Sequence, residues 1–368
     1  MRIPFGDLGR QFTAHQPELE AAALRVLRSG WYVLGAEVKA FEAEWAAFCR
    51  ASHAIGVANG TDALHLGLRA VGVGADDEVI TVPNAAGYAA FACRLIGARP
   101  VYADVDLDTW TINPVSVEKL ITARTRAIVP VHLYGAPANM QALSTIADRH
   151  GVALVEDCAQ AHGTEAQGRP VGSWGALACF SFYPTKNLGA LGDAGAVVTG
   201  DDELAERVRR LRQYGWTKKY WATEPYGLNS RLDELQAALL RVRLATLGED
   251  NRRRVELANC YRELLADVPG LRLPADLPGH VYHLFVVRVG AGRRDPLRES
   301  LREQGVESVV HYPVPDYLQP ALAGFGAGLG TAPVAEQLAG EVLSLPCYPE
   351  LSLDEAREVA AAVRVGLV

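Results

Sequence analysis

The chain has 368 residues, of which 49% are hydrophobic and 21% charged, and its formal net charge is −7. This composition is that of a soluble globular protein, and the length favours a large domain with its own core plus a smaller one. The acidic balance argues against a general nucleic-acid-binding surface. No apolar run reaches the roughly 20 residues that a membrane helix needs, and the N-terminus lacks a signal-peptide core. We therefore expect a cytoplasmic protein with no membrane or nucleic-acid partner.

Short β-rich runs alternate with helical patterns between about residues 50 and 200. Most of these runs lack polar alternation, as expected for strands that are covered on both faces. Apolar residues at helical spacing occupy 61–70, 115–122 and 139–150, between the strands. The alternation predicts an α/β fold in which helices cover both faces of a sheet. The expected strands are 53–58, 78–83, 99–105, 127–134, 152–157, 176–183 and 195–199.

The pattern changes after residue 200. Residues 201–213 read as an amphipathic helix opened by acidic residues, which suit the positive end of a helix dipole. Residues 214–228 are polar and aromatic without periodicity, which indicates a functional or mobile loop. A single long helix is expected from about 231 to 265.

The last part of the chain is expected to form a smaller α+β unit, with strands near 281–289 and 307–312. We place the domain boundary near 245–255. The chain then divides into a large domain, residues 1–250, and a small C-terminal domain, residues 251–368. The six cysteines form no C-x-x-C pair and are expected to be reduced, and we expect no metal ion.

Lys186 is the leading candidate for an amine nucleophile. It is one of only five lysines, and it stands in the turn SFYPTKNLGALGDAG just beyond an apolar strand. The end of a strand is a typical position for a site residue in an α/β fold. A solvent-exposed lysine in a turn would look the same if Lys186 stood alone.

Asp157 ends the apolar run VALVED, so a carboxyl group emerges where a buried strand finishes. A carboxylate that pairs with a pyridine nitrogen keeps that nitrogen protonated, which makes pyridoxal phosphate an effective electron sink. Glu156 should point to the opposite face, because successive side chains of a strand alternate. A simple turn cap remains an alternative for Asp157.

The segment VANGTDALHLGLRA joins a strand to a helix through Asn59, Gly60 and Thr61. Unpaired N–H groups at such a helix start favour an anion, so the turn is a candidate phosphate cradle. Ser181 could offer its hydroxyl to the same phosphate. An ordinary capped turn, and a serine that bonds only to backbone, are the competing interpretations.

Taken together, NGTDAL, VHLYG, VEDCAQAHG, SFYPTKNLGALGDAG and YGLNSRLDELQAALLR resemble the DegT-like nucleotide-sugar aminotransferases of the aspartate-aminotransferase fold. The resemblance covers nearly the whole chain. It implies fold type I, a large domain with a mostly parallel seven-stranded sheet sandwiched by helices, and pyridoxal 5'-phosphate as cofactor. Lys186 would form the Schiff base and Asp157 would pair with the pyridine nitrogen. The remaining implied cofactor contacts are Gly60 and Thr61 to the phosphate, Ser181 beside them, and Gln160 to the 3-hydroxyl.

The same resemblance implies a homodimer with shared active sites. Asn229, in YGLNSRLDE, matches an asparagine that in relatives reaches the phosphate of the neighbouring subunit. Lys219 and Arg231 lie beside that motif and are candidates for the diphosphate of the substrate. Roles as ordinary surface charges are the alternative for both.

Two positions depart from the family pattern. Relatives place an aromatic residue over the cofactor ring in a P-x-x-T-[FY]-x-A-T-like segment, whereas this chain reads VPNAAGYAAFA. Tyr88 is the stacking candidate, with packing against the following helix as the alternative. Asp316 stands where relatives usually have histidine. His311 and Tyr312, in HYPVPDYLQPAL, are candidates for lining the sugar pocket, again against simple packing.

The implied reaction passes an amino group from L-glutamate to a keto-sugar that is linked to a nucleotide, with the cofactor alternating between its pyridoxal and pyridoxamine forms. Local segments most resemble enzymes that act on a 3-keto-6-deoxyhexose linked to dTDP. A 4-keto-sugar or an aminocyclitol precursor remains open, because relatives of both kinds can carry glutamine at the position of Gln160. Lys186 argues against a dehydratase, since relatives that remove a hydroxyl carry histidine there.

Two other classes of function are weighed against the aminotransferase. A NAD-dependent enzyme would need a G-x-G-x-x-G between its first strand and helix, and that fingerprint is missing. A non-catalytic regulator on the same fold has no chemical need for both Lys186 and Asp157.

Overall fold

The computed structural model describes residues 2–290 and 292–367. Its centre is a seven-stranded sheet with the strand order β1-β9-β8-β5-β4-β2-β3. Only β9 runs against its two neighbours, and the other pairs are parallel. A strand forms at each of the seven expected places, most of them one to four residues shorter than predicted, and β4 begins two residues before the expected 127 and ends at Ile128. They are β1 (His53–Val57), β2 (Glu78–Thr81), β3 (Arg99–Tyr102), β4 (Thr125–Ile128), β5 (Ala153–Asp157), β8 (Leu177–Ser181) and β9 (Gly195–Thr199).

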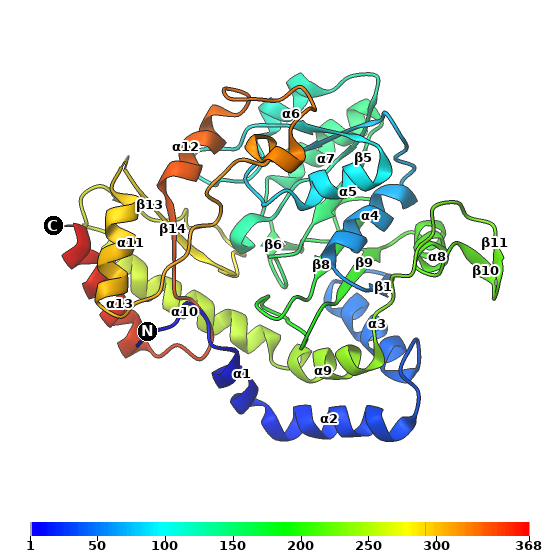
Figure 1. Cartoon of the computed structure of the whole chain (residues 1–368), viewed down its shortest axis with the longest axis horizontal. Helices are drawn as coiled ribbons and strands as arrows, with labels where there is room; N and C mark the ends of the chain where they lie inside the picture. The colour runs from blue at the N-terminus through cyan, green and yellow to red at the C-terminus, as the bar shows by residue number, and fades with distance from the viewer. Residues whose placement is uncertain (1, 291, 368) are drawn as a thin grey trace.

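Helices cover both faces of this sheet (Figure 1). Successive strand residues enter different cores, as the neighbours Cys179 and Phe180 of β8 do. Cys179 joins the side chains of α4 (Gly60–Ala70), α5 (Tyr88–Ile96) and α8 (Asp202–Leu211). Phe180 joins the opposite core. That core is covered by α3 (Ala36–Phe48), α6 (Pro114–Leu120), α7 (Met140–His150) and part of α9 (Glu234–Leu244). The apolar strand pattern thus reflects burial on two sides.

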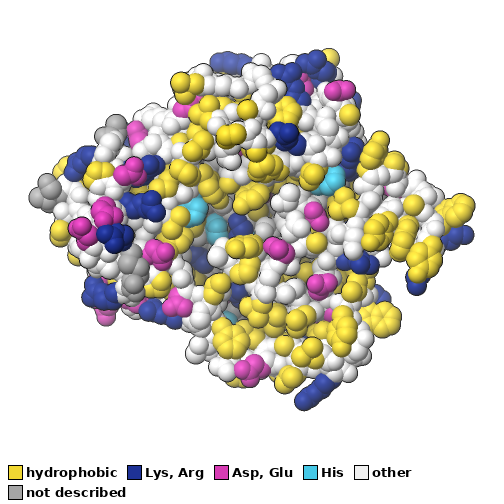
Figure 2. Space-filling view, in the orientation of Figure 1, with side chains coloured by type: hydrophobic (Ala, Val, Ile, Leu, Met, Phe, Trp, Pro, Cys, Tyr) yellow, Lys and Arg dark blue, Asp and Glu magenta, His cyan; other side chains and the backbone are white. Residues whose placement is uncertain are grey.

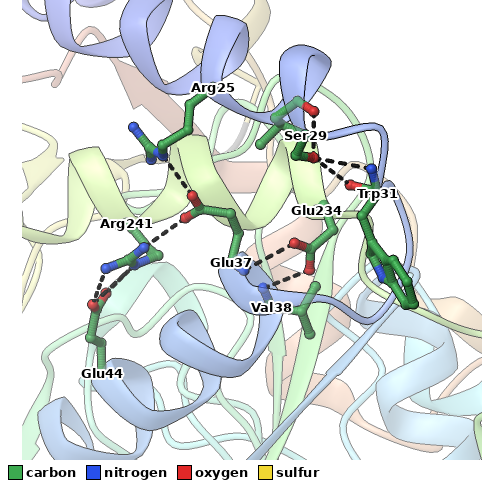
Figure 3. A network of polar contacts seen from close by, with 9 residues as sticks. Arg25, Ser29, Trp31, Glu37, Val38, Glu44, Glu234 and Arg241 are labelled. Carbon is green, nitrogen blue, oxygen red and sulfur yellow. Dashed lines mark hydrogen bonds and ion pairs between the residues drawn. The ribbon is translucent and has the colours of Figure 1, made fainter.

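The N-terminal region forms helices that the strand pattern of the sequence does not predict. Helices α1 (Leu8–Ala14) and α2 (Gln16–Ser29) precede α3, and α2 packs against α9 along the lower edge of Figure 1. Figure 3 shows the polar network of this region. The buried carboxylate of Glu234 accepts hydrogen bonds from the backbone N–H groups of Gly35, Glu37 and Val38 at the start of α3. It therefore supplies a cap from another helix to N–H groups that have no partner within α3.

The expected single helix over 231–265 is wrong, because the chain forms two helices there. Helix α9 ends at Leu244 and α10 (Leu247–Leu265) begins after Thr246. The Thr246 hydroxyl donates to the carbonyl of Arg243 and contacts the Asp250 carboxylate. Threonine bonds readily to nearby backbone, which favours helix ends over helix interiors.

The C-terminal region contains a second core around a three-stranded antiparallel sheet. Its strands are β12 (Leu271–Arg272), β13 (Phe285–Val289) and β14 (Val342–Leu345), packed with α10, α11 (Arg294–Glu303) and α13 (Leu353–Leu367). β13 confirms the strand expected near 281–289. The strand expected near 307–312 is wrong, since within the described chain this segment makes only isolated backbone pairs, one between Val309 and Ser344 and one from Glu307 to Ile3. The following Pro313 has no N–H to continue a ladder.

The remaining described elements are short. Within the loop expected over 214–228, β10 and β11 form a hairpin that projects from the body at the right of Figure 1. No helix of the described chain is long and apolar enough to cross a membrane. The short elements are η1 (Leu133–Gly135), β6 (Glu165–Ala166), β7 (Arg169–Pro170), β10 (Trp216–Lys218), β11 (Trp221–Ala222), η2 (Asp316–Leu318), η3 (Pro320–Leu322) and α12 (Pro333–Glu341).

Candidate active site

A cavity of about 700 Å³ opens at the carboxyl edge of the large sheet. The face shown in Figure 2 is hollowed near its centre. Strands β1, β5 and β8 run in the same direction, so the residues that follow them meet at this edge. Ligand sites of open α/β sheets lie at the carboxyl ends of strands. Predicted site residues that line this cavity are Gly60, Thr61, Tyr88, Asp157, Ser181, Lys186, His311 and Tyr312.

One end of the cavity is the N-terminus of α4. The side chain of Asn59 caps this helix by accepting from the N–H of Asp62 at 2.8 Å. Within the described chain, the N–H groups of Gly60 and Thr61 have no acceptor. A Cβ on Gly60 would lie 2.6 Å from the Cβ of Ser181, so only glycine fits this close approach. The free N–H groups and the dipole of α4 suit a phosphate.

Asp157 is the last residue of β5 and is 4% exposed. One carboxyl oxygen accepts from the N–H of Ala159 at 3.0 Å. Burial raises the pKa of this carboxyl, while that hydrogen bond and the nearby charge of Lys186 act in the opposite direction. A cationic ring nitrogen placed beside Asp157 would favour the carboxylate further.

Lys186 follows β8 in a tight turn. Its N–H donates to the carbonyl of Tyr183 at 2.8 Å, and a Cβ on Gly189 would lie 2.4 Å from the carbonyl oxygen of Pro184. Burial lowers the pKa of the Lys186 amine to about 8, and Asp157 opposes this shift. Among the described residues Lys186 has no ion-pair partner. A much larger share of this amine is therefore neutral near pH 7 than for an exposed lysine.

These groups fit pyridoxal phosphate. The cofactor needs an amine for its aldehyde carbon, a carboxylate for its ring nitrogen and donors for its phosphate. Lys186, Asp157 and the N-terminus of α4 supply one of each, and all three line the same cavity.

The structure places the residues predicted beside the ring as follows. Tyr88 is the first residue of α5, is about half exposed, and lines the cavity near Asp157. Burial raises the pKa of the Tyr88 phenol, and the charge of Asp157 raises it further. Gln160 is buried and does not line the cavity. Its amide accepts from the N–H of Tyr134 and donates to the hydroxyl of Tyr312 at 3.0 Å. Gln160 thus holds Tyr312, which does line it.

Three predicted residues lie away from the cavity. Lys219 sits in the turn of the β10–β11 hairpin, where its ammonium lies 5.1 Å from the ring of Tyr220. Asn229 is exposed and pairs through its backbone with Gln213. Arg231 is half-buried two residues further on. One chain alone does not bring these three to Lys186.

The cavity also contains residues that sequence patterns did not single out. Tyr183 lies in the same turn as Lys186, and its position in SFYPTK was the only available signal. His283 and Glu350 reach the cavity from the C-terminal region, and Phe5 reaches it from the N-terminal segment. Their separation along the chain hides this convergence from a sequence pattern.

A second polar cluster lies close by on the other side of β5. His132, Glu156 and Cys158 are buried and could in principle hold a metal ion. The Glu156 carboxylate, however, accepts from the N–H groups of Gly172, Trp174 and Gly175 and pairs with His132 at 3.2 Å. Its lone pairs are occupied by these donors, so the cluster is explained as part of the fold.

Comparison with known proteins decides the family. Residues 14–364 match the model of the DegT/DnrJ/EryC1/StrS aminotransferase family. The chain belongs to this family. A dTDP-3-amino-3,4,6-trideoxy-alpha-D-glucose transaminase of Streptomyces venezuelae is 52% identical over 366 residues, covering 99% of this chain and 96% of the relative. The EryC1 protein of Saccharopolyspora erythraea, named as a sensory transduction protein of erythromycin biosynthesis, is 51% identical over 369 residues, with full coverage of both chains.

A solved structure gives the same result. The crystal structure of S. venezuelae DesV in complex with a ketimine intermediate superposes with a TM-score of 0.96 at 51% identity, covering 99% of this chain and 98% of that one. Aminotransferases of the DegT/DnrJ/EryC1/StrS family depend on pyridoxal phosphate. The predicted fold class, the assignment as an aminotransferase and the cofactor are therefore confirmed.

Proposed function

We propose that this DegT/DnrJ/EryC1/StrS aminotransferase moves the amino group of L-glutamate to the keto group of a dTDP-linked 3-keto-6-deoxyhexose, which yields a 3-amino sugar. The observation that carries the proposal is the buried amine of Lys186, which shares one cavity with Asp157 and the free N–H groups of α4. The S. venezuelae relative, named as a transaminase of a dTDP-3-amino sugar, supports the substrate class.

When bound, pyridoxal phosphate supplies an electron sink that allows an amine to be carried from donor to acceptor. Lys186 would hold the cofactor through Nζ, and its amine would move a proton to or from the substrate carbon. The Asp157 carboxylate holds the proton of the ring nitrogen. Gly60 and Thr61 bind the phosphate, with Ser181 beside them, and Tyr88 stacks on the ring.

The sugar contacts are assigned to the other side of the cavity. His311 and Tyr312 line the sugar pocket, and Gln160, which does not itself line the cavity, acts at the 3-hydroxyl of the cofactor through the Tyr312 hydroxyl that it holds in place. The hydrogen bond from Gln160 to Tyr312 at 3.0 Å supports this coupling. We also propose that residues 1–250 and 251–368 are separate domains and that the protein acts in the cytoplasm.

The active unit in this proposal is a homodimer. Exposed apolar side chains on and after α2 support it, since monomers rarely expose large patches of this kind. In the dimer, Asn229 binds the cofactor phosphate of the partner subunit, and Lys219 and Arg231 bind the diphosphate of the substrate held there. The exposed side chains include Leu24, Leu27, Trp31 and Tyr32, and the hairpin adds Tyr220 and Trp221.

The reaction is tested with purified protein loaded with pyridoxal phosphate. L-Glutamate should convert the visible band of the bound cofactor to the near-ultraviolet band of its pyridoxamine form, and a dTDP-linked 3-keto-6-deoxyhexose should reverse the change. Reversal only by a 4-keto isomer or a keto-cyclitol would contradict the proposed substrate. No band change with any amino donor would favour a regulatory role, for which the named EryC1 relative gives a precedent.

The shared site is tested by mixing two inactive variants. Subunits with Lys186→Ala and subunits with Asn229→Asp should regain activity when hybrid dimers form, because one of the two sites then has an intact Lys186 and an intact partner Asn229. Light scattering should give twice the mass of 39.6 kDa. A monomeric active enzyme, or no recovery in verified hybrids, would contradict the shared site.

A further inference from the structure

Two histidines line the cavity, His283 and His311. Burial lowers the pKa of His311 to about 4, with the charge of Lys186 acting in the same direction. Burial also lowers the pKa of His283 well below its usual value. Both rings are therefore neutral near pH 7, and each carries one N–H donor and one lone-pair acceptor. The hydrogen bond at one ring nitrogen decides which nitrogen keeps the proton.

For His283, a chain of side-chain amides decides the position of the proton. The carbonyl of His162 can only accept, so it receives a hydrogen bond from the amide nitrogen of Asn251 at 2.8 Å. This turns the Asn251 oxygen toward Asn187, whose amide nitrogen donates to it at 2.9 Å. The oxygen of Asn187 then faces Nδ1 of His283 at 3.0 Å. An amide oxygen only accepts, so Nδ1 of His283 carries the proton.

For His311, the deciding group is Ser344 on β14. The serine hydroxyl lies 2.9 Å from Nδ1 of His311, and Ser344 is 0% exposed. In the part of the chain that the structure describes, Nδ1 is the only acceptor within reach of this hydroxyl. If Nδ1 carried the proton, the buried hydroxyl hydrogen would have no acceptor, which is costly. Nδ1 of His311 therefore accepts, and Nε2 carries the proton.

The backbone fixes this contact. The N–H of Ser344 donates to the carbonyl of Val309 at 2.8 Å, and the N–H of Val309 donates back at 3.2 Å. This single bridge sets Ser344 opposite the segment that carries His311. On the N-terminal side, the ring of Phe5 lies 5.6 Å from the ring of His311. The imidazole is thus held on two sides, and Nε2 is the nitrogen that no described residue engages.

We infer that His283 and His311 hold opposite tautomers, with the proton on Nδ1 in His283 and on Nε2 in His311, and that Ser344 is the positioning residue that makes His311 a hydrogen-bond donor in the cavity. His283 presents an Nε2 lone pair. The cavity then contains one imidazole acceptor and one imidazole donor, although both side chains are the same.

The two tautomers predict which hydrogen-bonding groups the substrate presents to His311 and His283, and this prediction rests on the proposed function. His311 recognises an acceptor oxygen of the sugar that has no proton to give at that point, such as a carbonyl, a ring or a glycosidic oxygen. A hydroxyl that accepts from His311 must donate its own hydrogen elsewhere. His283 recognises a group that donates, such as a hydroxyl or an N–H.

The tautomers can be read directly by nitrogen-15 NMR of protein labelled at histidine, using correlations between ring nitrogens and ring carbon-bound hydrogens. His311→Gln and His283→Gln assign the two signals by their loss. We expect the proton on Nε2 in His311 and on Nδ1 in His283, both unchanged between pH 6 and 8 because neither ring titrates in that range. A wild-type His311 with its proton on Nδ1 overturns the inference without any variant of Ser344.

Variants then test the role of Ser344. Ser344→Ala should lower the fraction of His311 protonated at Nε2 and lower kcat/KM for the keto-sugar about tenfold, as expected for one oriented hydrogen bond, with a smaller effect on the glutamate half-reaction. Ser344→Thr keeps the hydroxyl and should restore both. Ser308→Ala is the matched control, because the buried Ser308 hydroxyl has no described partner.

The outcomes separate two failures. An unchanged His311 tautomer in Ser344→Ala overturns the role of Ser344. A wild-type protein with the expected tautomers but no transfer to any keto-sugar overturns the proposed function and leaves the tautomer assignment intact.

Discussion

Glu156 and Asp157 are consecutive residues at the end of β5, yet they lie on opposite sides of the sheet and differ in what surrounds them. Both are buried, at 0% and 4% exposure. Glu156 accepts three backbone hydrogen bonds and pairs with His132. From the described residues, the Asp157 carboxylate accepts only one hydrogen bond, from the N–H of Ala159, and it faces the cavity. Burial of a charge therefore does not mark a site, whereas a buried charge with unused bonding capacity does.

Among the residues on the cavity side of β5, substitution of Lys186 should cause the largest loss of activity. Lys186→Ala should lower the rate of the half-reaction with L-glutamate by at least about 10³-fold, because it removes the amine that moves the proton. The apoprotein should be no less stable, since the variant no longer buries an amine without an ion-pair partner. Absorbance changes on adding glutamate measure the first effect and urea unfolding the second. A conversion at the wild-type rate would contradict the assignment.

On the side of β5 away from the cavity, substitution of Glu156 should lower stability rather than activity. Glu156→Gln places an amide nitrogen among N–H donors and should lower the free energy of unfolding by about 3–5 kcal/mol, as for other broken buried pairs. Urea denaturation measures this loss. Activity per folded molecule should stay near that of the wild type, because the side chain does not reach the cavity. A stable but inactive variant would mean that Glu156 has a chemical role.

Asp157→Asn is the substitution on the cavity side that corresponds to Glu156→Gln. Asp157→Asn should lower turnover by about 10²–10³-fold, the usual cost of losing one electrostatic partner of the reacting group. Its free energy of unfolding should change little, because one N–H among the described residues, that of Ala159, donates to this carboxyl. Single-turnover kinetics and urea unfolding of the same sample give both values. Loss of stability with normal turnover would reverse the comparison.

Glu234 extends the comparison to the network in Figure 3. Glu234→Ala removes the acceptor of three N–H groups at the start of α3 and should cost about 2 kcal/mol of unfolding free energy. Glu44→Ala is the control, since Glu44 is a partly exposed partner of Arg241 and should cost less than about 1 kcal/mol. Equal losses for the two variants would contradict the capping role.

The smallest expected effect is a pH profile. The pKa of Lys186 is lowered to about 8, so the share of neutral amine grows with pH up to that value and then levels off. The rate at which the apoprotein forms its visible cofactor band should rise about tenfold per pH unit well below pH 8 and flatten above it. A rate that still rises steeply beyond pH 9 would indicate an ordinary, unshifted lysine.

The sequence predicts the large sheet well for a physical reason. Strands buried on both faces are continuous apolar runs, and residues at a strand end or in the turn that follows it, such as Asp157 and Lys186, lie at the carboxyl edge of the sheet. The strand predicted over 307–312 failed because pairing there depends on β14, far along the chain. The break between α9 and α10 at Thr246 was not predicted, because apolar residues at helical spacing continue across it.

The site was predictable where its residues are local to one strand and its following turn. His283 and Ser344 could not be found in this way. His283 lies on a segment that reads as an ordinary strand, and Ser344 contributes only because β14 is paired opposite Val309. Tertiary pairing, which no local pattern encodes, brings His283 to the cavity and Ser344 to His311.

The first residues of the chain contact residues 305–307, which are synthesised much later. Ile3 pairs through its backbone with Gly305 and Glu307, and the N–H of Phe5 donates to the Glu307 carboxylate beside the cavity. Ile3 and Phe5 therefore have no partner for these contacts until about 300 further residues have been synthesised, and contacts between such distant residues slow folding.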